Sequence, residues 1–356
     1  MERKKIVHIV QFDKKFTLSY YRFFEAKMES YQHKYFYVDK VNDEEYLSEQ
    51  LPDNSLLFLF GRKNMTSFKL EITDAYRIIV SGVFSSYIPL LIPKKYRNKV
   101  ILHFWGGDYT QYRENSLIKK IKKIYMASFI NDCRCIVNLI DSEYTDFKEI
   151  FKSSKNHSSA RFPALREKPF DYNKIIEETS VVAHRIIVGN SATPSNHHIE
   201  VFEVLQKFSN MDLEIHCPLA YGDKSYCDKV ITEGKKIFGD KFHSYTVMQA
   251  PEDYVKLLAT CEIGIFNNDR QQALGNIKKL LLLGKKVYIR NDTPMWEWFK
   301  KNEVQVFNVS ELMGITYIDL FKFDKSLGEK NAKHLSLKLN IDTTIKEWEN
   351  VLEDNY

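Results

Sequence analysis

The chain alternates short apolar runs with longer stretches in which apolar and polar residues follow a helical period. The first half contains six apolar runs of strand length, at residues 5–12 (KIVHIVQF), 35–38 (YFYV), 56–60 (LLFLF), 77–82 (RIIVSG), 99–105 (KVILHFW) and 134–139 (RCIVNL). The first helical stretch spans residues 17–32. Short runs that are apolar throughout and alternate with helices are typical of a parallel sheet covered on both faces.

A second series of the same kind occupies the rest of the chain. Its runs lie at residues 185–190 (RIIVGN), 213–219 (LEIHCPL), 242–248 (FHSYTVM), 262–266 (EIGIF), 286–290 (KVYIR) and 304–309 (VQVFNV). Residues 152–180 are polar and include Pro163 and Pro169, so we interpret them as the crossing between two domains. The pattern therefore predicts an α/β protein with two Rossmann-like domains, whose ligands bind at the carboxyl ends of strands in the cleft between the domains.

Length and composition are consistent with this organisation. A chain of 356 residues suits two domains, each large enough for its own core. No apolar run approaches the roughly 20 residues that a membrane span needs, and MERKKIVHIV lacks the pattern of a signal peptide. The five cysteines are scattered, and Cys133-Arg134-Cys135 does not have zinc-knuckle spacing. We therefore expect a cytoplasmic protein with free thiols.

The positive charge is concentrated in the first half. Residues 1–170 hold 29 basic and 20 acidic residues, a net charge of +9, whereas the remainder holds 23 and 27, a net charge of −4. Residues 94–134 alone hold ten basic and three acidic residues. This asymmetry favours an anionic partner for the first domain, although a solvated basic surface would give the same count.

Several familiar motifs are absent, which narrows the function. The sequence contains no Gly-x-Gly, no Gly-Lys-Ser/Thr and no Asp-x-Asp. We therefore expect neither a dinucleotide cofactor nor a P-loop, and no metal of the kind that Asp-x-Asp holds in nucleotide-sugar enzymes. Nucleic-acid binding is not expected either, because the basic residues do not belong to a known reading module.

The stretch VGNSATPSNHH (188–198) has the form of an anion site. A buried strand runs into Gly189, Asn190 and Ser191, and Ser195 is a suitable N-cap for a helix over residues 195–209. Free backbone N–H groups and the helix dipole together favour a phosphate at such a place. An ordinary strand-to-helix turn with a cap is the alternative.

A second polar loop, FNNDRQQALGN (266–276), lies between a strand and a helix. Arg270 at the strand's carboxyl end could pair with phosphate oxygens, and Gln271 and Gln272 could bind sugar hydroxyls or a base edge. Gly275 would allow a ligand close to the backbone. An exposed polar loop is the alternative.

The loop at residues 218–226 (PLAYGDKSY) follows another strand of the second series. Tyr221 or Tyr226 could close over a ligand there, and a plain surface loop fits the sequence equally well.

In the first domain, HFWGGDYTQYR (103–113) carries the candidate chemistry. Trp105 offers an apolar face to a sugar ring, and Asp108, after two glycines, could act as a general base. Asp13, just past the first strand, is a second candidate base. The alternatives are a helix N-cap for Asp108, a turn residue for Asp13 and a core histidine for His103.

Together these stretches resemble glycosyltransferase family 56, the TDP-N-acetylfucosamine:lipid II N-acetylfucosaminyltransferases. The matching motifs are WGGD (105–108), VGNS…SNHH (188–198), the loop at 218–221, RQQALG (270–275), PMW (294–296) and, more weakly, YRFFEA (21–26). The chain departs from the family pattern at Gly107, where alanine is usual, and at Ala192, where glycine is usual.

The resemblance implies a metal-independent GT-B glycosyltransferase. Residues 1–170 would bind the acceptor, residues 171–340 would bind the nucleotide-sugar donor, and a C-terminal helix within 341–356 would pack back on the first domain. The reaction would move 4-acetamido-4,6-dideoxygalactose from a TDP-sugar to a polyprenyl-diphosphate-linked saccharide in bacterial cell-surface polysaccharide synthesis. The enzyme would be peripheral on the cytoplasmic face of the inner membrane.

The resemblance and the loops above define the expected site. Its base would be Asp108 or Asp13, with Asp108 preferred. The donor-binding residues would be Gly189, Asn190, Ser191, Asn196, Tyr221, Arg270, Gln271, Gln272, Gly275 and Asn276, with the N–H groups of residues 189–191 and Arg270 on the diphosphate. The acceptor-binding residues would be His103, Trp105, Gly106 and Gly107.

Residues 116–130 (SLIKKIKKIYMASFI) interleave four lysines with apolar side chains, a pattern that suits a helix resting on anionic lipid. A core-facing amphipathic helix is the alternative. Two other functions stay open: a different nucleotide-sugar enzyme on the same fold, such as an epimerase, and a binding protein that has lost catalysis.

Overall fold

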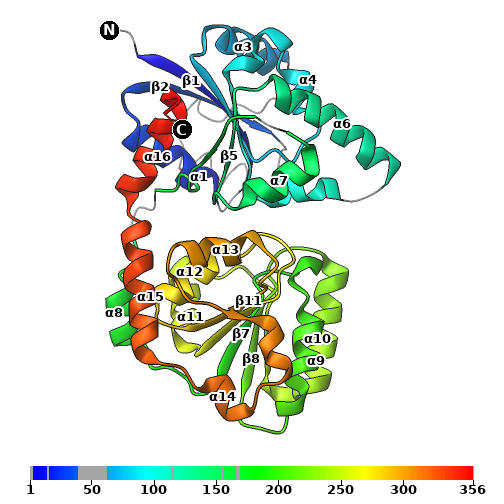
Figure 1. The fold of residues 1–356 in the computed structure, drawn as a ribbon, viewed down its shortest axis with the longest axis vertical. Coiled ribbons are helices and arrows are strands. Elements are labelled where there is room, and N and C mark those ends of the chain that lie inside the picture. The colour runs from blue at the N-terminus through cyan, green and yellow to red at the C-terminus, as the bar shows by residue number, and fades with distance from the viewer. Residues whose placement is uncertain are drawn as a thin grey trace. The chain divides into compact units, whose positions relative to one another are not determined.

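The computed structural model describes residues 3–13, 16–38, 62–113, 116–153, 155–165 and 169–355, with side chains in the third range from residue 65. The run at 56–60 that we predict as a strand lies outside the described residues. The chain divides into two compact units: unit 1 is Met1–Lys168 with Ile341–Tyr356, and unit 2 is Pro169–Asn340. Each unit is an α/β layer structure, as Figure 1 shows.

Unit 1 is built on a six-stranded sheet with the order β2-β1-β3-β4-β5-β6, in which every paired neighbour is parallel. Its strands are β1 (Lys4–Gln11), β2 (Tyr31–Val38), β3 (Arg77–Ser81), β4 (Val100–His103), β5 (Cys135–Asn138) and β6 (His157–Ser159). Its helices are α1 (Thr17–Lys27), α3 (Arg62–Asp74), α4 (Ile88–Leu91), α5 (Gly107–Thr110), α6 (Leu117–Asp132), α7 (Glu143–Phe151) and α16 (Ile341–Glu353).

The sheet of unit 1 has an apolar core on each face. Val7 and Ile9 of β1 join one core, whereas Ile6 and Val10 join the other. Successive side chains of a strand point to opposite faces, so a strand that is apolar throughout must be covered on both. This burial explains why the sequence shows continuous apolar runs instead of alternation.

The C-terminal helix α16 belongs to unit 1 and covers one of these faces. Trp348, Val351 and Leu352 are fully buried in the core that contains Ile6 and Val10. On one side of the helix, Arg161 Nη2 lies 2.9 Å from Glu347 Oε1. The apolar face of α16 therefore completes the core of unit 1.

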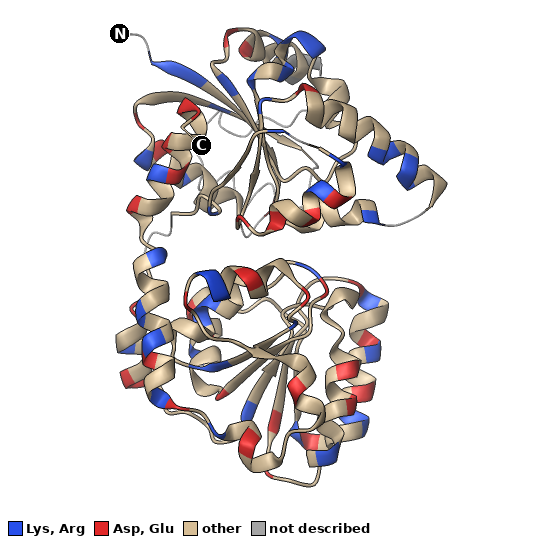
Figure 2. Cartoon of the chain, in the orientation of Figure 1, with Lys and Arg blue, Asp and Glu red and all other residues tan. Residues whose placement is uncertain are grey.

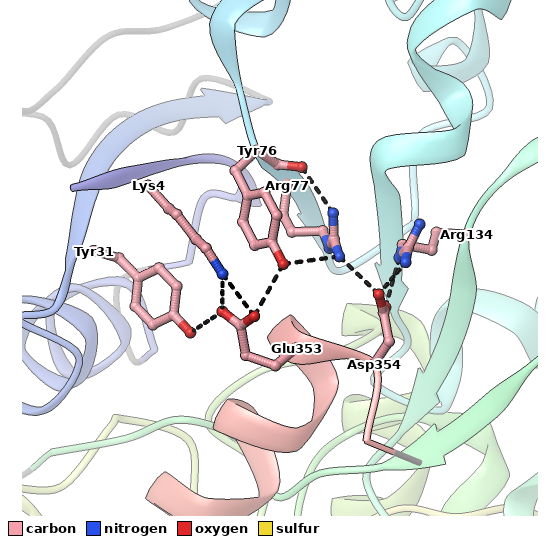
Figure 3. A network of polar contacts seen from close by, with 7 residues as sticks. All are labelled: Lys4, Tyr31, Tyr76, Arg77, Arg134, Glu353 and Asp354. Atoms are coloured by element: carbon pink, nitrogen blue, oxygen red, sulfur yellow. Dashed lines mark hydrogen bonds and ion pairs between the residues drawn. The ribbon is translucent and has the colours of Figure 1, made fainter. Parts of the chain in front are cut away.

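The end of α16 is held by a polar network at the amino ends of the strands (Figure 3). Glu353 accepts hydrogen bonds from Lys4 (2.7 Å), Tyr31 (2.7 Å) and Tyr76 (3.0 Å). Asp354 accepts from Arg77 at 2.8 Å and from Arg134. These partners come from segments far apart in sequence, so the network fixes the register of the last helical turn.

Unit 2 repeats the architecture with the strand order β12-β11-β10-β7-β8-β9, again parallel throughout. Its strands are β7 (Arg185–Val188), β8 (Glu214–Pro218), β9 (Phe242–Tyr245), β10 (Ile263–Phe266), β11 (Lys286–Ile289) and β12 (Phe307–Asn308). Its helices are α8 (Tyr172–Glu178), α9 (His198–Leu205), α10 (Lys224–Phe238), α11 (Pro251–Thr260), α12 (Leu274–Leu282), α13 (Pro294–Lys301), α14 (Tyr317–Phe321) and α15 (Lys325–Lys338).

The two parallel sheets with helices confirm the predicted fold class, and some boundaries differ. Helix α1 ends at Lys27 instead of residue 32, because β2 already begins at Tyr31 and pairs with β1 along its whole length. The segment 152–180 is more than a crossing, since it supplies edge strand β6 and helix α8. Strand β6 reads His-Ser-Ser, which carries no apolar signal.

Candidate functional site

Each sheet has one place where the order of strand addition reverses. In unit 2, β7 lies between β8 and β10, and in unit 1, β1 lies between β2 and β3. Loops that leave the carboxyl ends of such neighbouring strands diverge to opposite faces and open a crevice, where ligands of open α/β sheets bind. Most of the predicted site residues follow the strands at these two switch points.

At the switch point of unit 2, Gly189 follows β7 in a conformation that requires glycine. Its φ is +68°, and a Cβ there would lie 2.3 Å from His198 Nε2 and 3.0 Å from Asn196 Oδ1. The loop is thus pressed against α9 at a spacing that no side chain would allow.

The side chain of Asn196 closes this loop. Its Oδ1 accepts the N–H of Asn190 at 3.0 Å, and its Nδ2 donates to Ser191 Oγ (3.2 Å) and the Thr193 carbonyl (3.0 Å). The N–H of Gly189 donates to the Ile265 carbonyl at 2.9 Å. Two of the N–H groups that we expect on a diphosphate therefore already have partners, which corrects that part of the predicted site.

The helix start that we predict at Ser195 is also wrong. A 3₁₀ turn spans Pro194–Asn196, His197 takes a left-handed conformation with φ +49°, and α9 begins only at His198. Ser195 Oγ instead donates to Gln272 Oε1 at 2.6 Å. Because the Asn196 side chain points inward and bonds the Gly189 loop, residues 194–196 form a 3₁₀ turn in place of the first turn of the helix.

The loop after β10 joins the same cluster through Gln272. Its Nε2 donates to Asn190 Oδ1 at 3.2 Å and to Ser191 Oγ at 3.3 Å. Close by, His197 Nε2 lies 3.2 Å from Asp269 Oδ2. Four residues predicted as donor-binding, Asn190, Ser191, Asn196 and Gln272, thus form one hydrogen-bonded group.

The loop after β8 completes the cluster. Tyr221 accepts a hydrogen bond from Asn190 Nδ2 at 2.8 Å and is 42% exposed. Gly222 lies against the backbone of Ala192, where a Cβ would approach within 2.5 Å. Tyr226 instead accepts the N–H of His198 at 3.1 Å. Of the two tyrosines, Tyr221 is the exposed member of the cluster.

The remaining predicted donor residues lie beside this group. Arg270 is half-buried and donates to the Gln271 carbonyl at 3.2 Å, while the Gln271 and Asn276 side chains are mostly buried. Gly275 is exposed, and a Cβ there would meet no atom within 4 Å. The structure itself gives no steric reason for glycine at that position.

Asn268 is a further polar residue at this switch point, and it was not predicted as a site residue from the sequence. Asn268 is fully buried, and within the described part of the chain neither of its amide atoms has a hydrogen-bond partner. Leaving such a group unpaired costs about 1–3 kcal/mol. Its only sequence signal is the Asn-Asn pair directly after a strand.

At the switch point of unit 1, the surroundings are aromatic. Asp13 follows β1, is half-buried, and donates its N–H to Thr17 Oγ1 at 3.0 Å, next to the start of α1. Gly82 follows β3 with φ +79°, and a Cβ there would lie 2.7 Å from Gln11 Cβ and 3.2 Å from Trp105. This close packing brings the loop after β3 against Trp105.

Trp105 is the centre of this aromatic group. Its ring centroid lies 5.3–5.9 Å from those of Phe16, Phe84 and Phe162, and its Nε1 donates to Ser81 Oγ at 3.1 Å. Trp105 is half-buried and Phe84 is 39% exposed. The phenylalanines were missed because only folding brings them to Trp105.

Asp108 is fully buried and holds two loops together. Its carboxylate accepts the N–H of Trp105 at 2.9 Å and that of Val83 at 2.9 Å. Burial raises its pKa to about 6, although the backbone hydrogen bonds lower it. Gly106 is the N-cap of α5 with φ +94°, and Gly107 is the first residue of that helix. In this conformation the carboxylate joins the loop after β3 to the loop after β4.

A second buried carboxyl, Glu143, lies behind Asp108 and was not singled out from the sequence. It accepts hydrogen bonds from Tyr109 Oη and the Ile140 N–H, both at 3.2 Å. Burial raises its pKa to about 8, and the charge of Asp108 adds to the increase. Glu143 is therefore largely protonated near neutral pH.

His103 is a core residue, which is the alternative that the sequence left open to acceptor binding. It is fully buried, its Nδ1 lies 2.9 Å from Ser81 Oγ, and its ring packs edge-on against Trp348 at 5.0 Å. Burial lowers its pKa to about 3. Its surroundings give it no exposed surface for an acceptor.

Comparison with known proteins gives a family match along nearly the whole chain. The model of the 4-alpha-L-fucosyltransferase family, glycosyl transferase group 56, matches residues 4–352.

Solved structures match the whole fold at low sequence identity. Anabaena HepE, solved with UDP and glucose, has a TM-score of 0.74 at 11% identity, with 99% of this chain and 100% of that chain covered. A glycosyltransferase from Rickettsia africae has a TM-score of 0.65 at 13% identity, with 99% of each chain covered. WaaG, a glycosyltransferase of lipopolysaccharide biosynthesis, has a TM-score of 0.63 at 10% identity, with 98% and 99% covered.

Proposed function

Because the chain belongs to glycosyl transferase group 56, the 4-alpha-L-fucosyltransferase family, we propose that it transfers 4-acetamido-4,6-dideoxygalactose from a TDP-sugar to a polyprenyl-diphosphate-linked saccharide. The enzyme is a glycosyltransferase with the GT-B fold. The product would serve bacterial cell-surface polysaccharide synthesis. A structural match solved with UDP and glucose is consistent with a nucleotide-sugar donor.

The hydrogen-bonded loops at the switch point of unit 2 carry the proposal. Asn190, Gln272 and the exposed Tyr221 are held in fixed positions before any ligand arrives. Such preorganised polar groups orient a ligand at small entropic cost. The buried, unpaired amide of Asn268 adds a group that a ligand could satisfy after a small loop movement.

Arg270 is proposed as the charge partner of the diphosphate, in place of a metal ion. It lies in the loop after β10, close to the start of α12, and a guanidinium can bind phosphate oxygens in a bidentate manner. When the bond between the anomeric carbon and the phosphate oxygen breaks, the leaving nucleotide gains negative charge that Arg270 would stabilise.

Burial supports Asp13 over Asp108 as the general base. The carboxylate of Asp108 is fully buried and occupied by backbone N–H groups, whereas Asp13 is half-buried at the end of β1. Asp13 would take the proton of the acceptor hydroxyl as its oxygen bonds to the anomeric carbon. Trp105 and Phe84 would offer aromatic faces to the acceptor sugar.

A donor screen followed by a transfer assay tests this proposal. Thermal stabilisation should be larger with TDP-sugars than with UDP- or GDP-sugars, because binding to the folded state raises the unfolding midpoint. Radiolabelled sugar should then move to a polyprenyl-diphosphate-linked disaccharide. Interconversion of free nucleotide sugars without transfer would favour an epimerase, and binding without turnover would favour a silent binding protein.

We also propose that α6 rests on an anionic membrane. Its exposed apolar side chains include Leu117 (75%), Ile118 (67%), Ile121 (61%) and Ile124 (72%). Lys119, Lys120, Lys122 and Lys123 lie among them, and Asp132 is the only acidic residue of the helix. Figure 2 shows the basic residues along α6, and Figure 1 shows the helix projecting beyond α7 within unit 1.

Apolar side chains flanked by lysines suit the boundary between lipid headgroups and acyl chains. Among the described helices, none has the length and apolar character to cross a bilayer. A surface-bound mode therefore fits the exposed face of α6.

Vesicle co-sedimentation tests the role of α6. The enzyme should bind vesicles that contain phosphatidylglycerol more strongly than pure phosphatidylcholine vesicles, and the double variant Ile121→Asp/Ile124→Asp should lose this binding. Ile318→Asp is the matched control, because Ile318 is 77% exposed but lies in unit 2. Equal binding by all three proteins would exclude α6 as the contact.

A further inference from the structure

Three metal-ligating side chains converge near the edge of the sheet in unit 2. Glu214 and His216 lie two residues apart on β8, and His243 on edge strand β9 is the register partner of His216. One ligand atom from each residue lies within 4.8 Å of the other two. Ile215 and Cys217, which alternate with them, pack in the core on the opposite face.

His216 is the buried member of the three, and both of its ring nitrogens lie close to polar groups. It is 3% exposed. Its Nδ1 lies 2.7 Å from Tyr245 Oη and its Nε2 lies 3.0 Å from Glu214 Oε2. A tyrosine hydroxyl can donate or accept, so Tyr245 can support either tautomer, including the one that frees Nε2 for a metal.

Glu214 is held in place from one side. Arg185 contacts it through Nε at 2.8 Å and through Nη2 at 2.7 Å, and both contacts are to Oε2. Neither contact uses Oε1. Arg185 therefore orients the carboxylate while it reduces the charge that the carboxylate offers to a cation.

We propose that Glu214, His216 and His243 bind a divalent transition-metal ion of the zinc class. Two imidazole nitrogens and one carboxylate oxygen are a common ligand set for zinc, with water in the fourth position. Small side-chain rotations would bring the three ligand atoms to the spacing of a tetrahedral site. The ion would link edge strand β9 to β8.

The site is separate from the proposed donor site. Glu214 is the first residue of β8 and His243 the second of β9, whereas the donor cluster lies in loops beyond the carboxyl ends of β7, β8 and β10. The metal is thus a structural element, and sugar transfer does not depend on it. The sequence analysis missed the site because its ligands are joined only by strand pairing.

Cobalt and zinc titrations of the full chain test the proposal. After treatment with EDTA and dialysis, the wild type should bind one Zn²⁺ per chain with a dissociation constant on the order of 10 µM, because Arg185 weakens the site. Co²⁺ at the site should give the absorption bands of four-coordinate cobalt. Zn²⁺ should also raise the unfolding midpoint of the wild type.

His243→Ala is the main variant, because His243 is only half-buried on an edge strand and its removal should leave the fold intact. It should weaken Zn²⁺ binding at least 10-fold, and Tyr245→Phe should weaken it by about 10-fold through the loss of support for His216. His184→Ala is the matched control, since His184 also pairs with a carboxylate, Asp212, on the same unit. Absence of binding, or equal binding by wild type and His243→Ala, would overturn the proposal.

Discussion

The two switch points share a topology but are lined by different chemistry. In unit 2 the loops are joined by amides and hydroxyls, with Asn190, Asn196 and Gln272 at the centre. In unit 1 the corresponding place is an aromatic group around Trp105, next to the carboxylates Asp13 and Asp108. Topology therefore decides where each unit can bind a ligand, and the loop residues decide what it can bind.

The difference follows from what each proposed ligand would need. A nucleotide diphosphate carries charge and many acceptors, so a polar frame with a nearby arginine suits it. A sugar hydroxyl that must lose a proton needs a carboxylate beside an apolar surface that orients the ring. Substitutions at the two switch points test this difference in proposed ligands, beginning with the largest expected effect.

The largest effect should come from Asp13→Asn, which removes the proposed base. Turnover should fall by roughly 100-fold or more, with donor affinity unchanged, because a lost general base affects only the chemical step. Steady-state kinetics and donor calorimetry measure the two quantities.

Asp108→Asn is the comparison variant for Asp13. It should lower the free energy of unfolding by about 1–3 kcal/mol, because an NH₂ group would replace one of the two oxygens that accept the Trp105 N–H and the remaining oxygen would be an uncharged acceptor. If Asp108→Asn lost as much turnover as Asp13→Asn without loss of stability, the base would be Asp108.

In unit 2, Gly189→Ala should destabilise the protein by about 2–4 kcal/mol. The backbone there has a positive φ, which is unfavourable for alanine, and the new Cβ would clash with His198. Donor affinity should fall with it, as the loop is displaced. Gly275→Ala provides the contrast: that position is open and helical, so alanine should be neutral or stabilise by up to about 1 kcal/mol. Denaturant unfolding measures the free energy of unfolding of both variants. Equal changes in the two variants would contradict the difference in backbone conformation and packing between Gly189 and Gly275.

Arg270→Ala should weaken binding of TDP by about 1.5–3 kcal/mol, the usual loss for a charge-assisted hydrogen bond. EDTA should leave the affinity of the wild type unchanged. Lys278→Ala on α12 removes the same charge outside the proposed contact and is the control. Calorimetry in which EDTA abolished binding and Arg270→Ala had no effect would assign the diphosphate to a metal instead.

The buried carboxyl of Glu143 should make the stability of unit 1 fall as pH rises toward 8. Its folded pKa is about 8 and its usual value is 4.5, so the folded state binds the proton more tightly. The stabilisation is present below the usual pKa and is lost as pH rises toward 8, by about 4–5 kcal/mol.

Glu143→Gln should remove this slope, whereas Glu149→Gln on the exposed side of the same helix should keep it. Urea unfolding between pH 5 and 8.5 measures the effect. Parallel stability profiles for wild type and Glu143→Gln would show that Glu143 is not the source.

The sequence determined the elements that depend on local pattern. Runs such as RIIVSG and RIIVGN are apolar throughout because both faces of a parallel strand are buried, so two parallel sheets could be predicted from period and spacing alone. The glycines after these strands, Gly82 and Gly189, also mark turns that need a positive φ, which is a local property. The polar loops at 188–198 and 266–276 could be placed at strand ends for the same reason.

Only the tertiary structure decided which of these side chains meet and which are buried. The sequence favours Asp108 over Asp13 as the base, but in the structure Asp108 is fully buried and accepts the N–H groups of Val83 and Trp105. Ser195 looks like a helix cap, but Asn196 turns inward to close the Gly189 loop, and the helix starts later. Glu214, His216 and His243 come together only through the pairing of β8 with β9. Contacts between segments distant in the sequence depend on sheet order and burial, which the local pattern of residues does not contain.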